Sequence, residues 1–152
     1  MRKQVFGRQF SRTKNQRQAL FRGLIGTLVE KGEIVTTLAK AKAVQSQAEK
    51  LITKAKKGDL SNKRVILRFL TKKYLVNRLV LGIAPLFKEK NGGYLRIIKL
   101  GQRKGDKAAM AQLSFTEDFS KIILKPVKEV KKEEIKESKK VEKKEAKKEK
   151  TK

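Results

Sequence analysis

Apolar residues recur at helical spacing in the first third of the chain and predict an amphipathic helix ending at Gly32. Thr13 followed by Gln16 fits a capping box at its start, and Asn15 is an alternative cap. Its apolar face comprises Leu20, Phe21, Leu24, Ile25, Leu28 and Val29. Gly23 and Gly26 lie inside this helix, where they indicate close approach of another backbone or of a ligand. A tight helix–helix contact is the favoured interpretation.

Three more helices follow from the same pattern. The first spans roughly 38–57, is capped by Thr36 or Thr37, and ends at Gly58. A short helix capped by Ser61 or Asn62 contains apolar residues between 65 and 70. Another, capped by Thr71, reaches its last turns at Pro85, and the stretch 81–87 is expected to be irregular.

Three segments have strand character instead. The β-branched residues of 33–37, the apolar run 94–100 and the alternating run 110–116 predict three strands, with a long loop at 101–107 joining the last two into a hairpin. The expected fold is α/β (α+β) and two-layered, with a small mixed three-stranded sheet covered by about four helices. The element order is α-β-α-α-α-β-β. Tyr94 and Phe87 are interpreted as core residues rather than base-stacking platforms.

Composition divides the chain into three parts. We expect an extended basic N-terminal arm at 1–13, a folded α/β domain at 14–125, and a disordered low-complexity tail at 126–152. The tail holds 12 lysines and 7 glutamates, so most of the net charge of +26 belongs to the first 125 residues.

This charge predicts a polyanionic partner: nucleic acid, an anionic membrane surface or an acidic protein. Cysteine and histidine are absent, which removes the thiolate nucleophile, the commonest general base and the commonest metal ligands. We therefore expect no enzyme activity, no metal, no cofactor and no small-molecule substrate. No membrane span or secretory signal is evident, and a cytoplasmic location is expected. Because aromatic residues make up only 6% of the chain, backbone and shape recognition of folded nucleic acid is favoured over repeated base stacking.

The segment from Arg2 to Arg22 is the strongest candidate binding element, since it is rich in arginine and contains no acid. Its basic residues are Arg2, Lys3, Arg8, Arg12, Lys14, Arg17 and Arg22. The loop residues Arg103, Lys104 and Lys107 flank Gly105, which allows close backbone approach to a phosphate. The alternative for this loop is an ordinary solvated hairpin tip.

Three further cations complete the candidate site. Lys40 and Lys42 lie in the first turns of a helix, where the dipole disfavours cations by about 0.3–1 kcal/mol. They indicate a nearby anion, although a solvated helix face explains them almost as well. Arg96 lies within a strand, where it either extends to solvent at a sheet edge or adds charge to the surface of the arm.

An ordered series of motifs resembles the bacterial large-subunit ribosomal protein seventeen family over about 2–116. The motifs are Gly7-Arg8 with Arg12, Arg17-Gln-Ala-Leu-Phe-Arg22, Thr36-Thr37 followed by Lys40-Ala-Lys42, Gly92-Gly-Tyr-Leu-Arg-Ile97, and Gly105-Asp-Lys-Ala-Ala-Met-Ala111. The resemblance implies a two-layer α/β fold. It also implies binding to large-subunit ribosomal RNA (rRNA) near the polypeptide exit tunnel, beside other ribosomal proteins.

The sequence leaves two other classes of polyanion-binding protein open. A DNA-compacting protein would share the charge but should bind duplex DNA as well as rRNA. A membrane-surface protein is disfavoured because the arm lacks a wide apolar face.

Overall fold

The computed structural model describes residues 7–117 and 119, so Arg2, Lys3 and the tail at 126–152 lie outside the described residues. Helix α1 (Lys14–Lys31) begins at the predicted capping box, in which the Thr13 side chain accepts from the Gln16 amide and the Gln16 side chain accepts from the Thr13 amide. It ends at Gly32, whose φ of 86° lets its N–H donate to the Leu28 carbonyl. Both predicted ends are confirmed.

Helix α2 (Leu38–Lys57) also ends as predicted, at Gly58. Helix α3 (Leu60–Leu70) instead begins two residues early: Asp59 occupies its N-cap, and the Asp59 carboxylate accepts from the Asn62 side chain. Helix α4 (Lys73–Asn77) follows Lys72 rather than Thr71 and continues as a π-helical segment, η2 (Arg78–Ile83), and the short α5 (Ala84–Leu86). The predicted caps at Ser61, Asn62 and Thr71 are therefore wrong, because other residues adopt the extended backbone that precedes each helix.

The sheet contains β1 (Glu33–Thr37), β2 (Leu95–Gln102) and β3 (Ala109–Phe115) in the order β1-β3-β2. Both pairings are antiparallel, so the prediction of a mixed sheet is wrong. Strands β1 and β2 run in the same direction, but β3 lies between them and no parallel pair forms. Ile34 and Ile97 both face Leu113 across the sheet, which fixes the register of the apolar face.

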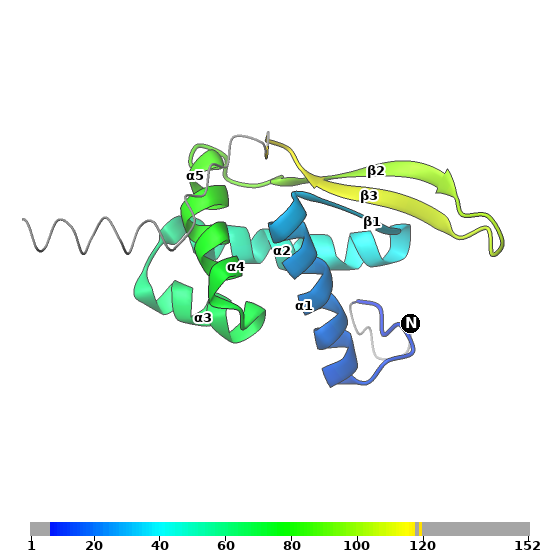
Figure 1. Cartoon of the computed structure of the whole chain (residues 1–152), viewed down its shortest axis with the longest axis horizontal. Coiled ribbons are helices and arrows are strands. Elements are labelled where there is room, and N and C mark those ends of the chain that lie inside the picture. Colours follow the sequence, from blue (N-terminus) through cyan, green and yellow to red (C-terminus); the bar gives the residue numbers. More distant parts are fainter. Residues whose placement is uncertain (1–6, 118, 120–152) are drawn as a thin grey trace, which may run out of the picture. The chain divides into compact units, whose positions relative to one another are not determined.

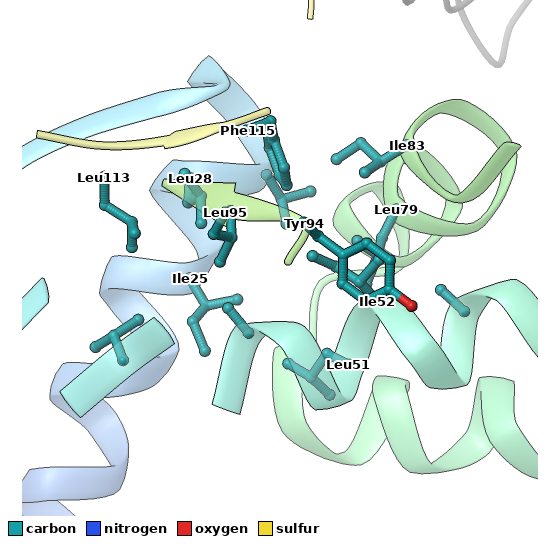
Figure 2. Packing of buried hydrophobic residues seen from close by; sticks show 14 of the residues in the cluster. Ile25, Leu28, Leu51, Ile52, Leu79, Ile83, Tyr94, Leu95, Leu113 and Phe115 are labelled. Atoms are coloured by element: carbon teal, nitrogen blue, oxygen red, sulfur yellow. The ribbon is translucent and has the colours of Figure 1, made fainter. Parts of the chain in front are cut away.

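The helices cover one face of this sheet, and the β2–β3 hairpin extends beyond them (Figure 1). Figure 2 shows Leu113 and Leu95 of the strands in the same buried cluster as Ile25 and Leu28 of α1. The predicted α+β fold with two layers is thus observed. The opposite face leaves apolar side chains exposed, with Val35 at 61% and Ile98 at 43%.

The core prediction for Phe87 and Tyr94 is confirmed, since they are 0% and 1% exposed. Their rings meet edge-on with centroids 5.3 Å apart, and Phe87 also contacts the Phe115 ring at 5.9 Å. This cluster joins the end of the helical layer to the base of the hairpin.

The two glycines inside α1 differ in their surroundings. A Cβ built on Gly26 would lie 3.4 Å from a methyl carbon of Leu75 in α4, which fits the favoured helix–helix contact. A Cβ on Gly23 would meet nothing within 4 Å. Of the two glycines inside α1, Gly26 is therefore the one that packs against another helix, at ordinary van der Waals distance.

Candidate nucleic-acid interface

The described end of the arm, residues 7–12, is turned back on α1 rather than fully extended. Phe10 and Ser11 adopt left-handed backbone with φ of 55° and 50°. The Phe10 ring meets Phe21 of α1 edge-on, with centroids 6.1 Å apart. Arg12 closes the turn through a side-chain hydrogen bond of 2.8 Å to the Phe10 carbonyl. Arg8 is therefore presented on an anchored turn.

The basic residues of α1 serve two different purposes. Lys14 and Arg17 lie one turn apart in the first half of the helix, and their side chains make no hydrogen bond or ion pair within residues 7–117 and 119. Arg22 is different, because its Nε donates to the Phe69 carbonyl near the end of α3 at 2.6 Å. This bond fastens α1 to α3, so Arg22 has a structural contact that its charge in the sequence does not indicate.

The hairpin tip is held by an ion pair inside the loop. Arg103 donates to both carboxylate oxygens of Asp106, at 3.1 and 2.7 Å. The Ala108 amide donates to the same carboxylate at 3.2 Å, and the Arg103 amide bonds the Ala108 carbonyl at 2.9 Å. Asp106 is thus a turn residue, and it also orients Arg103. Lys104 and Lys107 remain exposed at the tip.

These bonds lower the pKa of Asp106 to about 2, chiefly through the hydrogen bonds from Arg103 and next through that from the Ala108 amide. A lowered carboxyl pKa stabilises the folded loop at pH values above the ordinary value of 3.8, and this contribution is lost as pH falls toward 2. We expect the Asp106 carboxyl carbon to titrate in NMR with a midpoint near 2. A midpoint near 3.8 would show that the ion pair does not form in solution.

The remaining predicted residues fall into two places. Lys40 and Lys42 lie at the start of α2, directly after β1, whose last residue Thr37 pairs with Met110 next to the hairpin tip. They therefore belong to the tip end of the sheet. Arg96 donates to the Ser114 hydroxyl at 3.4 Å on the sheet face away from the helices, so it does not share the surface of the arm.

A groove between α1 and α2 brings together residues that the sequence prediction did not connect. Its volume is about 400 Å³, and Lys50 and Lys54 of α2 line it opposite Lys14 and Arg17 of α1. Phe21, Leu51 and Phe69 also line it. The sequence signal was available: positions 14, 17, 18 and 21 and positions 47, 50, 51 and 54 have the same spacing, which puts each set on one helix face. Their pairing depends on how the helices pack.

Other classes of site find no support in residues 7–117 and 119. No cluster of three or more acidic side chains there could hold a metal ion. Within the same residues, every helix is too short or too polar to cross a membrane.

Comparison with known proteins gives a consistent answer. The family model of ribosomal protein L17 matches residues 20–116. The large ribosomal subunit protein bL17 of Thermodesulfovibrio yellowstonii is 48% identical over 134 residues, covering 88% of this chain and 97% of that protein. The bL17 proteins of Trichlorobacter lovleyi and Dictyoglomus turgidum are each 44% identical, covering 78% and 76% of this chain and 95% and 99% of their own lengths. The resemblance seen in the motifs is confirmed, and the chain belongs to the ribosomal protein L17 family, a family of ribosomal structural proteins rather than enzymes.

Proposed function

We propose that this chain is a structural protein of the bacterial large ribosomal subunit, working in the cytoplasm. It binds large-subunit rRNA near the polypeptide exit tunnel through its basic arm and hairpin loop. The relatives carry the name of the large subunit, and the position near the tunnel follows from the family resemblance. Neighbouring large-subunit proteins are proposed as further partners on the same basis.

The proposal depends mainly on the many basic side chains that have no acidic partner within the chain. Among residues 7–117 and 119, two ion pairs form, Lys90 with Glu117 and Arg103 with Asp106. The chain as a whole holds 41 basic residues against 15 acidic ones, so most of its cations lack an internal counter-charge. A polyanion supplies that charge, and its bound counterions are released when the protein replaces them.

The fold supports the proposal by fixing two basic elements on one body. Phe10 against Phe21 anchors the end of the arm to α1, and Asp106 fixes Arg103 at the tip of a two-stranded hairpin. The sheet and the helices beneath it connect the two (Figure 1). We propose that the arm and the tip contact separate rRNA segments and that the domain at 14–125 keeps the segments at a set spacing. No function is assigned to the tail at 126–152.

A competition experiment separates this function from DNA compaction. The full chain is bound to a labelled transcript of its cognate large-subunit rRNA and challenged with unlabelled rRNA or with duplex DNA at the same nucleotide concentration. We expect the rRNA to displace the transcript far more effectively, because the two anchored basic elements fit a folded RNA rather than a uniform duplex. Equal displacement by both competitors would favour an architectural DNA-binding protein.

A further inference from the structure

We propose that the groove between α1 and α2 binds one unstacked nucleotide of the RNA, with its base on the apolar floor and its phosphates at the basic rim. The rim comprises Lys14, Arg17, Lys50 and Lys54, and the floor comprises Phe21, Leu51 and Phe69. This inference rests on the proposed rRNA binding and adds a site and a ligand to it. Unpaired bases splayed from bulges and loops are the parts of RNA that proteins commonly stack on aromatic side chains.

Charge complementarity argues for this occupant. Each helix contributes two cations to the rim, and no acidic residue of the described part of the chain lines the groove. None of the four side chains has a hydrogen-bond or ion-pair partner within residues 7–117 and 119. An inorganic phosphate would leave the apolar floor unused, and an apolar peptide would leave the rim unpaired. A nucleotide uses both, because it joins a flat apolar base to phosphates.

The floor is already in place without a ligand. The Phe21 side chain is 6% exposed, and the Phe10 ring of the arm packs edge-on against it. The hydrogen bond from Arg22 to the Phe69 carbonyl holds the end of α3 against α1. This bond fixes the position of Phe69, the floor residue that α3 contributes. A preformed floor reduces the ordering cost of binding. The volume of about 400 Å³ lies within the usual range for small-ligand sites.

Two side-chain amides add a means of contacting the base edge. Gln18 lines the groove from α1 and Gln47 from α2. Each carboxamide offers both a donor and an acceptor, the groups that base edges require. Neither Gln18 nor Gln47 makes a side-chain hydrogen bond to the described part of the chain.

The position of the groove also suits the proposed path of the RNA. Phe10 of the arm packs on Phe21, which belongs to the groove floor, and α1 begins with the rim residue Lys14. The end of the arm and the groove therefore lie next to each other. An RNA strand contacted by Arg8 can place a neighbouring unpaired nucleotide in the groove.

Crosslinking tests the site directly, because the chain contains no cysteine and one introduced cysteine is a unique attachment point. A short photo-crosslinker is attached to Gln18→Cys or to Gln47→Cys in the full chain, and to Ser46→Cys as the control. Ser46 is exposed on α2 and does not line the groove. Each protein is bound to the cognate rRNA transcript, and the crosslinked nucleotide is mapped by reverse transcription.

We expect the two groove positions to crosslink to the same unpaired nucleotide and Ser46→Cys not to do so. Crosslinks confined to paired regions, or none while the RNA complex persists, would overturn the groove proposal. Crosslinks from the groove positions to a protein in assembled large subunits would also overturn the groove proposal. Failure of the wild-type chain to bind the transcript at all is a separate result, and it would contradict the proposed function itself.

Two variants give a second measurement. Phe69→Leu keeps an apolar floor but removes a stacking surface, and we expect affinity for the transcript to fall about 5- to 150-fold. A double variant, Lys50→Gln with Lys54→Gln, should reduce the slope of log K for the transcript against log salt. The matched control, Lys63→Gln with Lys73→Gln, removes the same charge from exposed positions outside the groove and should reduce this slope less. The Lys50 and Lys54 variant leaves the apolar floor unchanged, so its salt dependence can be interpreted even if Phe69→Leu alters the packing. Unchanged affinity in Phe69→Leu, with wild-type thermal stability, would overturn the proposal, as would equal slopes for the two lysine pairs.

Discussion

Replacing Arg8, Arg12 and Arg17 together by alanine should weaken rRNA binding and reduce the slope of log K against log salt by about two to three units. Each neutralised phosphate contributes nearly one unit of slope, and the three residues follow one another along the arm and the first turns of α1. None of the three is buried, and only Arg12 among them makes a side-chain hydrogen bond within residues 7–117 and 119, to the Phe10 carbonyl. The fold should therefore survive. Filter binding over a salt series measures both quantities.

The matched control removes the same charge elsewhere. Lys63, Arg64 and Lys73 are exposed on α3 and α4, and their replacement by alanine should change the slope much less. Arg22 stays unchanged in both variants, because losing its bond to the Phe69 carbonyl would confound binding with stability. Wild-type affinity and slope in the arm variant would show that the arm does not bind RNA.

Replacing Phe87 by alanine should lower the free energy of unfolding by about 3–5 kcal/mol, the usual cost of truncating a buried phenylalanine. Phe87 is fully buried, and its ring contacts both Tyr94 and Phe115 at the base of the hairpin. The cavity would remove the support between α5 and the two strands. Urea unfolding followed by circular dichroism measures the change.

Phe87→Leu provides the control for this variant, since it keeps most of the apolar volume and should cost much less. A cost below about 1 kcal/mol for the alanine variant would mean that the ring is not part of the core. Because the same cluster supports the hairpin, the alanine variant should also bind rRNA less tightly under conditions in which it remains folded.

Local signals in the sequence were sufficient for much of this fold. The capping box of Thr13 with Gln16 and the glycine at 32 set the ends of α1, because each acts within a few residues. The direction of β1 relative to β3 was not predictable, because alternation of apolar and polar residues is the same for parallel and antiparallel strands. That direction depends on where the intervening helices return the chain, which is a long-range property.

The candidate site likewise has features that local sequence predicts and features that depend on long-range packing. The basic arm and the glycine-containing tip are visible as runs of charge, and the turn role of Asp106 follows from its neighbours. The bond from Arg22 to the Phe69 carbonyl joins residues far apart in sequence, as does the groove that Lys14 and Lys54 both line, so no local pattern indicates either. Charge along the chain predicts that a polyanion binds, whereas helix packing decides which cations share a surface.

Sedimentation of the full chain with ribosomal particles in a high-salt gradient tests the central claim most directly. If the chain is a structural protein held on rRNA at several points, it should remain with the large subunit at a salt concentration that removes loosely attached basic proteins. Its amount should match that of the subunit. A chain that leaves the large subunit under these conditions, or sediments only with chromosomal DNA, would contradict the account.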